Sequence, residues 1–541
     1  MKNLILKTIV IALLWCNVNG QTKNVSIKYG DKDLKTQIGN ILTVDGNTNT
    51  GYFIVGRSED GLIIEKYDTN LRQVDTIFWS NSNKATNSKP VDVKVIFLKD
   101  KILLFRSLFN KENKTHELYC QVIDKSDFKR SGNEKAVASY QNAKSESGYG
   151  FNTLVSPDLT KLAVFTTKIA KDDEAGIVST TVYNSELNLL WEKKTPTLDH
   201  FYEYGGGFLD NQGNVFLRMV TYNEGWTHIK DKKPNSYYKL YCFTDNGNNA
   251  QNYKIEEKDK FFRGMRFKPN GKGEVICVGV YFNDYLYKYV SGIFSCKIDL
   301  NKNKLSPITF NSFSNEFIME GLGKRATGDM KKLEDNQKGI GSLVIKQLHI
   351  FPDGSSVVIS QVESSSIDNS QVDEVFFGWQ GGVRREIVLM SLDATGKEIW
   401  KAKILKDQGA SDDQRWLSYM SVNLYDSLIL LYNDHRDNLD LKPGDEIISY
   451  SSGAPSNKIA FGATKKSSKV VCKLVITPNG VVSKEEAFPA EPDLGEIRIN
   501  RSKQFDPNHL FLLTDKSIAI VTYNNVTKKI DLVNGYGEKK E

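Results

Sequence analysis

MSLDATGKEIWKAKI, residues 390–404, reads as an apolar strand, a turn opened by Asp393, and a second strand that carries Trp400. An Asp or Asn side chain can bond to its own backbone two residues on, so the turn has a physical mechanism. The same hairpin pattern recurs seven more times: EKYDTNLRQVDTIFW (65–79), CQVIDKSDFKR (120–130), TVYNSELNLLWEKK (181–194), YCFTDNGNNAQNYKI (241–255), CKIDLNKNKLSPITF (296–310), CKLVITPNGVVSKEEAF (472–488) and, faintest, VTYNNVTKKIDLV (521–533). A repeating sheet is therefore the unit of this protein.

The spacing of the hairpins indicates how the sheets are arranged. Repeats of tens of residues that contain strands and no helical pattern mark radial repetition of sheets. The third unit shows all four strands of one repeat, at 151–155, 161–167, 177–183 and 189–193. The sequence therefore predicts an all-β fold, a single β-propeller of about eight four-stranded blades. Seven blades is the alternative, if the last unit only completes its neighbour.

The two ends of the chain are expected to meet in the last blade. That unit is the weakest, because residues 496–500 make a poor inner strand. A ring has to cover its last edge, since an unpaired strand edge is a template for aggregation. We therefore expect the N-terminal stretch 25–44 to add a strand to the C-terminal blade.

The first twenty residues have the parts of a secretory signal peptide. Lys2 and Lys7 come before an apolar run at 9–15, and the small residue Gly20 precedes Gln21. The apolar run is shorter than the ~18 residues that a membrane span needs. Cys16 suggests lipid attachment, but the bulky side chain before it disfavours this. We expect a propeller domain at 21–541 that is exported to the periplasm or to the outside of the cell and has no membrane span. A lipid anchor in the outer membrane is the less favoured alternative.

The charge of the chain argues against a polyanionic partner. The formal net charge is +6, and removal of Lys2 and Lys7 lowers it to +4 (6 − 2). The positive charges are spread along the chain without a basic run, so nucleic-acid binding is not implied.

Two family resemblances support the fold. The segment LDATGKEIW, 392–400, resembles the outer-strand signature of tryptophan-docked, quinoprotein-type propellers, in which a Trp that ends one blade packs on the next. Only Trp79, Trp191 and Trp400 occupy this position, so the girdle of docked Trp residues is incomplete. The C-terminal part resembles uncharacterised secreted β-propeller proteins of Gram-negative bacteria, through VIKQLHIFPDGSSVVISQVE (344–363), LILLYNDHRDNL (428–439), CKLVITPNGVVSKEEAF (472–488) and RSKQFDPNHLFLLTD (501–515). This second resemblance implies the fold and secretion, and it carries no activity.

Long connections gather on one predicted face. In a propeller, the second-to-third strand turns and the links between blades lie on the same side. Here these connections are long, and long loops in a compact fold are usually functional or disordered. They span 222–235, 282–289, 311–342, 361–384 and 433–467.

These loops are rich in aromatic residues, which suits a site for a protein, a peptide or a glycan. The candidate binding residues are Trp226, Trp379, Tyr222, Tyr285 and Tyr432; the other rings are Phe282, Tyr287, Tyr289, Phe376, Phe377 and Phe461. For any one ring, the alternative is that it only pins its loop to the sheet beneath. The sequence thus favours a non-catalytic binding or scaffold protein that acts through the long-loop face on an envelope or extracellular partner.

Motifs for catalysis and cofactors are weak. The six histidines lack metal-ligand spacing, and we expect no cofactor and no metal. Asp434, His435 and Asp437 form the densest polar group, and Glu363 leaves the equivalent strand of the preceding unit. These four are weak catalytic candidates for the alternative function, an extracellular enzyme that cleaves a polysaccharide or peptide with carboxylates. The competing interpretation is a turn that satisfies its own backbone.

The cysteines do not predict a disulfide-built fold. Cys120, Cys242, Cys296 and Cys472 all fall on the third strand of their units. Equivalent positions in different blades lie too far apart to be bridged. Only Cys277, on the second strand of the fifth unit, has a possible neighbour, which is Cys296 across the hairpin.

Overall fold

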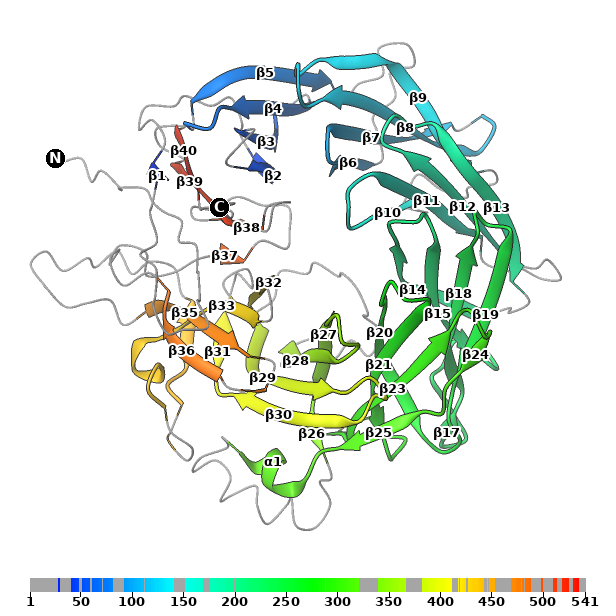
Figure 1. Ribbon diagram of the computed structural model, residues 1–541, viewed down its shortest axis with the longest axis vertical. Coiled ribbons are helices and arrows are strands. Elements are labelled where there is room, and N and C mark those ends of the chain that lie inside the picture. The colour runs from blue at the N-terminus through cyan, green and yellow to red at the C-terminus, as the bar shows by residue number, and fades with distance from the viewer. Residues whose placement is uncertain are drawn as a thin grey trace, which may run out of the picture.

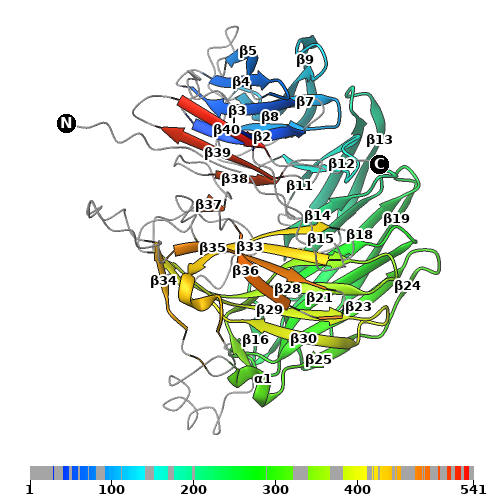
Figure 2. The same cartoon turned by 60° about the vertical axis from the view of Figure 1, so that its left-hand side comes forward.

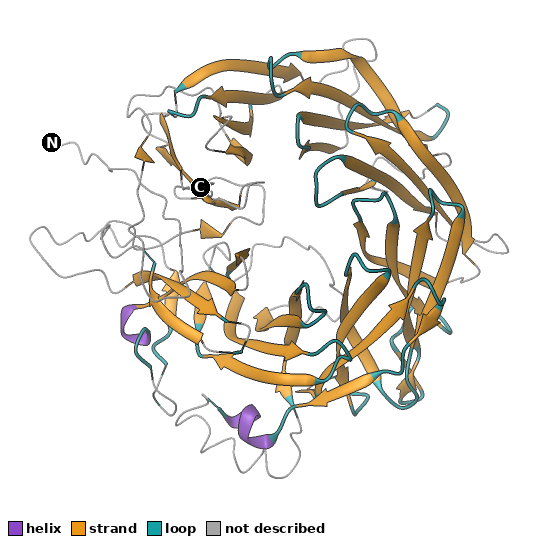
Figure 3. Cartoon of the chain, viewed as in Figure 1, coloured by secondary structure: helices purple, strands orange, loops and turns teal. Residues whose placement is uncertain are grey.

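Strands make up almost all of the described chain (Figure 3). The computed structural model describes residues 28–29, 40–47, 51–58, 61–70, 72–80, 92–110, 112–140, 151–168, 176–197, 201–287, 289–320, 339–365, 382–410, 417, 419–424, 427–441, 445, 447–452, 469–477, 479–480, 482–487, 498–499, 509–512, 518–524 and 529–534. Beside the strands, these residues form the helix α1 (Asn315–Met319) and the 3-10 turn η2 (Arg436–Asn438). None of the described helices has the length and apolar character needed to cross a membrane.

Eight sheets of four or more strands follow one another along the described chain. The first four comprise β2 (Asn40–Asn47), β3 (Gly51–Arg57), β4 (Gly61–Tyr67) and β5 (Gln73–Ser80); β6 (Asp92–Phe97), β7 (Lys101–Asn110), β8 (Thr115–Asp124) and β9 (Arg130–Tyr140); β10 (Asn152–Val155), β11 (Lys161–Lys168), β12 (Gly176–Asn184) and β13 (Leu189–Thr197); and β14 (Phe201–Leu209), β15 (Val215–Tyr222), β18 (Ser236–Thr244) and β19 (Asn249–Ile255). The four strands read from the sequence of the third unit are confirmed within a few residues at each end.

The later sheets carry additions to the four-stranded plan. The fifth to eighth comprise β20 (Phe261–Pro269), β21 (Glu274–Phe282), β23 (Gly292–Asp299), β24 (Lys304–Leu305) and β25 (Thr309–Ser312); β27 (Leu343–Ile350), β28 (Ser356–Ser365), β29 (Gly382–Leu392), β30 (Glu398–Ile404), β31 (Gln408–Ala410) and β34 (Tyr450–Ser452); β32 (Met420–Leu424), β33 (Ser427–His435), β35 (Lys469–Ile476) and β36 (Val482–Glu486); and β1 (Lys28–Tyr29), β37 (Arg498–Ile499), β38 (His509–Leu512), β39 (Ile518–Asn524) and β40 (Lys529–Asn534). Two small ladders, β16 (Ile229–Lys230) with β17 (Lys233–Pro234) and β22 (Tyr289–Val290) with β26 (Ile340–Gly341), lie in connections.

The sheets follow one another around a ring in a propeller-like arrangement, as Figure 1 shows. In the first seven sheets the first strand faces the centre, and the last strand, such as β5, β13 or β30, lies on the outside. Figures 1 and 2 both place β39 and β40 beside the first sheet. The predicted all-β architecture of repeated four-stranded sheets is therefore present.

The last sheet contains both ends of the described chain. Its order is β1-β40-β39-β38-β37, and Lys28 and Tyr29 pair with Asn534 and Val533. The expected N-terminal strand is thus confirmed for β1, whereas the rest of that predicted stretch, from Asn40 on, forms the innermost strand of the first sheet. The hairpin at 521–533 forms β39 and β40, and β1 pairs on the outer side of β40.

The core lies between the sheets. On β7, Ile102 and Leu104 pack into a buried cluster with the first sheet. Leu103 and Phe105, which alternate with them, pack into a cluster with the third sheet. Side chains alternate between the two faces of a strand, so an apolar run such as KILLF fills both interfaces at once. Similar clusters join each consecutive pair from the first sheet to the seventh.

A second contact links the outermost strands. Trp191, on the third sheet, donates its Nε1–H to the carbonyl oxygen of Gly213 on the fourth, at 3.0 Å. A Cβ at Gly247 would lie 2.7 Å from the same ring, and Gly247 also has φ +77°, so this turn requires glycine. Trp400 packs in the same way on Gly480 of the seventh sheet. The docking geometry expected from the resemblance is thus present at these two positions.

Other residues take the place of Trp where it is missing. On the fifth sheet, the Asn311 side chain donates to the carbonyl oxygen of Gly396 and accepts from the backbone N–H of Glu398, both at 3.0 Å. On the fourth sheet, the hydroxyl of Tyr253 bonds to Oδ1 of Asn303 at 2.8 Å. The incomplete girdle is therefore continued by hydrogen bonds from the outermost strand of one sheet to the hairpin of the next.

Trp191→Ala should lower the free energy of unfolding by about 3–5 kcal/mol, because it leaves a cavity between two sheets. Trp191→Phe should lower it less, since it keeps most of the ring and loses the bond to Gly213. Chemical denaturation followed by circular dichroism measures both. Leu190→Ala is the control: Leu190 is the neighbour on β13 and is 43% exposed, so its truncation should change stability by about 0.5 kcal/mol or less. Equal effects of Trp191→Ala and Leu190→Ala would contradict the docking role.

Candidate functional site

The loop that joins β15 to β18 is organised by one buried side chain. Asn235 donates from Nδ2 to the carbonyl oxygens of Glu224 and Thr227, at 2.6 and 2.7 Å. Its own backbone pairs with Asn223 and His228, both at 2.8 Å. Because Asn235 satisfies backbone groups on both sides of the loop, the loop has a defined shape. The short β16–β17 hairpin projects from this base.

The loop that joins β21 to β23 is anchored by Tyr287. This residue has φ +51°, an uncommon conformation for a residue with a large side chain. Its ring packs edge-on against Phe282 and Phe261, with centroids 4.8 and 5.4 Å apart. Burial raises the pKa of Tyr287 to about 12. After the anchor, β22 pairs with β26, which ties this loop to the segment before the sixth sheet.

The two loops are joined by a chain of rings. The Tyr222 ring lies 5.9 Å from Trp226 and 5.1 Å from His228. His228 in turn lies 6.3 Å from Tyr287 on the other loop. On the outside, Nζ of Lys232 lies 5.5 Å from the centre of the Tyr285 ring. These contacts join the two loops, and we call their exposed side chains Trp226, Tyr285 and Leu286 the aromatic surface.

Exposure separates the rings that anchor from the rings that are available. Tyr222 is 5% exposed and belongs to the core between the fourth and fifth sheets. Trp226 and Tyr285 are 41% and 37% exposed, and Leu286 is 64% exposed. Tyr222 therefore pins its loop, whereas Trp226 and Tyr285 are accessible and remain candidates for binding.

The remaining predicted binding residues differ from expectation or lie outside the description. Tyr432 is fully buried in the core between the sixth and seventh sheets, so it is not available to a ligand. The physical reason is its position on β33, inside the strand rather than after it. Trp379, with Phe376, Phe377 and Phe461, lies outside the described residues, as do 321–338, 366–381 and 453–468 of the long connections.

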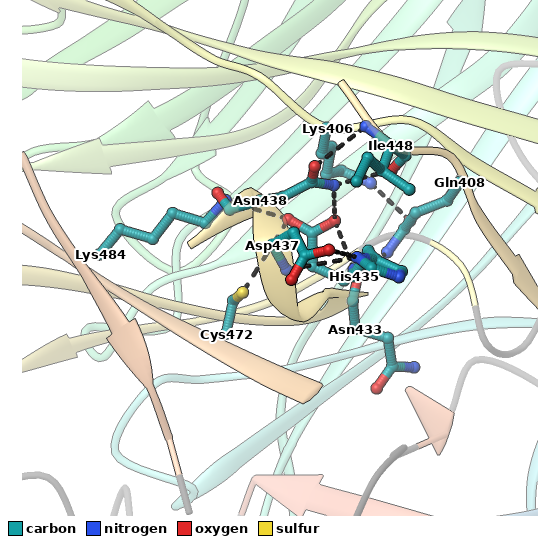
Figure 4. Close-up of polar contacts among 10 residues, drawn as sticks. Lys406, Gln408, Asn433, His435, Asp437, Asn438, Ile448, Cys472 and Lys484 are labelled. Atoms are coloured by element: carbon teal, nitrogen blue, oxygen red, sulfur yellow. Dashed lines mark hydrogen bonds and ion pairs between the residues drawn. The ribbon is translucent and has the colours of Figure 1, made fainter. Parts of the chain in front are cut away.

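The predicted polar group at the start of the 433–467 loop is a structural network (Figure 4). Asp434 is fully buried, and its Oδ1 accepts from the backbone N–H of His435 and from Nδ2 of Asn438, at 2.9 and 2.7 Å. Its Oδ2 lies 3.0 Å from Nζ of Lys484 on β36. Asn438 continues the network by a pair of bonds with the backbone of Ile448, at 2.7 and 3.0 Å. Every oxygen of Asp434 therefore has a partner within the fold.

His435 and Asp437 take part in the same turn. Nδ1 of His435 accepts the backbone N–H of Asp437 at 3.2 Å and caps η2. The Asp437 carboxylate is 69% exposed and lies 3.6 Å from the same Nδ1. This is the turn that satisfies its own backbone, the alternative left open above. An acid and base pair aimed at a substrate is not the arrangement found.

Glu363 is also held by cations. Its carboxylate lies 2.7 Å from Nζ of Lys346 and 3.0 Å from Nε of Arg384, and its side chain is 15% exposed. Glu363 and Asp434 share a neighbour in Lys406, since both carboxylates favour the charged form of that amine. The four weak catalytic candidates do lie in one region between the sixth and seventh sheets. The two inner carboxylates there are paired with partly buried cations.

Lys406 is the residue of this region that the sequence did not indicate. It is fully buried, and its Nζ donates to Oε1 of Gln408, whose Nε2 donates to the backbone carbonyl of Asn433 at 2.6 Å. Burial lowers the pKa of Lys406 from 10.5 to about 7. A lysine between an apolar Ile404 and a polar loop has no sequence pattern that marks it as buried. Among the described residues, no group of three His, Cys, Asp or Glu side chains is placed to hold a metal ion.

No family model and no curated protein sequence matches the chain. Among solved structures, it is similar to prolyl oligopeptidase B from Galerina marginata, with 8% identity and a TM-score of 0.38 over 90% of this chain and 55% of that chain. It is also similar to the Synechocystis apocarotenoid oxygenase, with 9% identity and a TM-score of 0.31 over 66% of this chain and 72% of that chain. The chain spans about half the length of the prolyl oligopeptidase. Likenesses this distant carry no inference about activity.

The depressed pKa of Lys406 predicts a specific pH dependence of stability. Between about pH 7 and its ordinary pKa of 10.5, the unfolded chain holds a proton on Lys406 more often than the folded chain does. The free energy of unfolding therefore rises with pH in this window, by at most about 1.4 kcal/mol per pH unit from this group. Lys406→Met should flatten that rise between pH 7 and 9.5 in urea unfolding. The exposed Lys397→Met variant should keep the wild-type slope, and an unflattened slope in Lys406→Met would contradict the burial of a neutral amine.

Proposed function

We propose that the protein is an exported, non-catalytic binding or scaffold protein. Its aromatic surface, Trp226, Tyr285 and Leu286, binds a protein, peptide or glycan in the envelope or outside the cell. The observation that supports this most directly is that the three side chains are exposed and stand on two loops whose bases are fixed by Asn235 and Tyr287.

The chemistry of this surface suits recognition. Aromatic rings offer large contact area at low cost in side-chain entropy, and binding energy at interfaces concentrates in a few such residues. Loops that already hold their bound shape lose little freedom on binding. Elsewhere in the described chain, most exposed large apolar side chains lie on outermost strands, as Phe78 and Ile399 do. A scaffold that uses its loops for binding fits this distribution.

The finer description of the fold belongs to the same proposal. The chain from residue 21 forms one closed ring of eight blades, and β1 closes it by completing the last blade. The first twenty residues direct export, as the resemblance to secreted propeller proteins of Gram-negative bacteria also implies. The pairing of β1 with β40 supports the closed ring.

The enzyme alternative is not favoured by the described geometry. Catalytic carboxylates of a glycoside hydrolase flank the scissile bond and need access to it. Asp434 and Glu363 are instead committed to cations inside the fold, as described above. A direct assay with dyed polysaccharides and fluorogenic peptides would reverse this choice if it found turnover that Asp437→Asn abolishes.

Trp226 should be the most sensitive position for ligand capture. A photo-crosslinking amino acid at position 226, in cells that export the chain, should capture a defined partner that is identified by mass spectrometry. Trp226→Ala should then weaken binding of that partner by about tenfold or more, with an unchanged melting temperature. The measurement is biolayer interferometry with the purified partner, or with the purified glycan if that is what is captured.

Phe78 provides the matched control for this experiment, because it is an exposed ring on an outermost strand, at 46% exposure. The crosslinker at 78 should capture no common partner, and Phe78→Ala should bind as the wild type does. Trp226→Ala with a lowered melting temperature and full ligand capture would show that the ring only anchors its loop.

Removing residues 21–34 should destabilise the last sheet, because it takes away β1 and leaves β2 intact. The bared edge of β40 then has unpaired backbone groups, and the melting temperature should fall by several degrees with increased self-association. Differential scanning fluorimetry and size-exclusion chromatography report the two effects. Deletion of 535–541, which follows β40, is the control and should leave both unchanged. An unaltered melting curve for the first deletion would show that the ring does not depend on this strand.

A further inference from the structure

Cys277 and Cys296 face each other across the middle of the fifth sheet. They lie on β21 and β23 and are directly opposite in the antiparallel register. All five described cysteines are buried free thiols. The other three, Cys120, Cys242 and Cys472, lie on the third strands of separate sheets. Cys277 and Cys296 are the pair that the described strand registers place in direct opposition.

The geometry of this pair suits a disulfide without movement of the backbone. Directly opposite residues of antiparallel strands have Cα atoms about 4.5–5.5 Å apart. That interval lies within the roughly 4.4–6.8 Å that disulfides span. The two thiols interact, with the S–H of Cys277 donating toward Sγ of Cys296. This bond, together with burial, raises the pKa of Cys277 well above its usual range.

We propose that Cys277 and Cys296 are an oxidative modification site, at which a cross-strand disulfide forms when the chain folds in an oxidising compartment. The two S–H bonds break and one S–S bond forms, with loss of two electrons and two protons. A disulfide-bearing oxidant accepts them and becomes a dithiol. The product ties β21 to β23 beneath the loop that carries Tyr285 and Leu286.

The burial of the pair determines when oxidation occurs. The thiolate is the species that attacks a disulfide. In the folded sheet the two side chains are 0% and 5% exposed, and Cys277 stays protonated. The folded dithiol therefore reacts slowly, and the bond forms during folding, before the fourth sheet packs over this face of the fifth. Once formed, the bond is reached by a reductant only when the sheets open, as they do on heating.

Among the described cysteines, Cys242 is the competing partner near the pair. It belongs to the same buried cluster and interacts electrostatically with Cys277. However, Cys242 lies on the fourth sheet, which faces the fifth across a packed interface. Sheets packed face to face lie about 10 Å apart, which is beyond the span of a disulfide. Cys242 is therefore a matched control: a buried thiol in the same core that should stay free.

Peptide mapping tests the pair directly. The full chain, exported from a bacterial host, is denatured without reductant, blocked with N-ethylmaleimide and digested with trypsin. Cleavage after Lys272, Lys288 and Lys297 places the two cysteines on separate peptides, 273–288 and 289–297. We expect these two peptides to be linked, and to separate on reduction. In the chain made in a reducing cytosol, both peptides should carry the maleimide. A third arm, refolding in oxidised and reduced glutathione, tests the pair independently of export and should also give the link.

Two variants distinguish the bond from packing. Dithiothreitol should lower the melting temperature of the oxidised wild type by about 3 °C or more. It should not change that of the double variant Cys277→Ala with Cys296→Ala. Cys242→Ala should keep both the link and the sensitivity to reductant. Maleimide on both peptides in the oxidised arms, a link from Cys242 to Cys277, or equal effects of reductant on wild type and double variant would overturn the proposal.

Discussion

The first seven sheets of this protein bury both of their faces, and most of the remaining structure depends on that constraint. A strand such as β7 sends alternate apolar side chains into two different cores. A sheet of this kind needs another sheet on each side. In a straight row, the first and last sheets would each keep one bare apolar face. The closed ring proposed above would remove that problem. The pairing of β1 with β40 brings the two ends of the described chain into one sheet.

The packing of sheet on sheet leaves the outer rim to be secured by other means. Trp191 does so with a ring and one hydrogen bond, and Asn311 does so with an amide alone. These side chains share no chemistry beyond a donor that reaches the hairpin of the next sheet. The position in the fold is therefore constant while the residue varies. A search for a repeated Trp would find only part of this rim.

The same constraint moves function to the connections. Since the sheet faces are used for packing, side chains that meet solvent in quantity lie on outermost strands and in loops. Some loop residues are used to build the loops themselves, as Asn235, Tyr287 and Asp434 are. The aromatic surface of Trp226, Tyr285 and Leu286 stands on such a base. Recognition by this protein would therefore rely on a few exposed side chains with strong local support.

The sequence by itself determined the features that depend on neighbours within a few residues. Asp393 opens a turn because its Oδ1 accepts the backbone N–H groups of Thr395 and Lys397, at 2.8 and 3.0 Å. Such local chemistry, repeated with alternating apolar strands, was enough to predict the repeated sheets and the third-strand positions of four cysteines. It was also enough to predict that an N-terminal segment joins the last sheet.

Only the tertiary structure decided which side chains are buried. Tyr222 ends β15 and Trp226 follows four residues later in the loop, yet the first is in the core and the second is exposed. Tyr432 and Asp434 read as loop residues and are enclosed, because segments far along the chain cover them, among them Lys484. Burial depends on what packs against a residue from other sheets. Local sequence carries no record of those distant partners, so the candidate site was predicted less well than the fold.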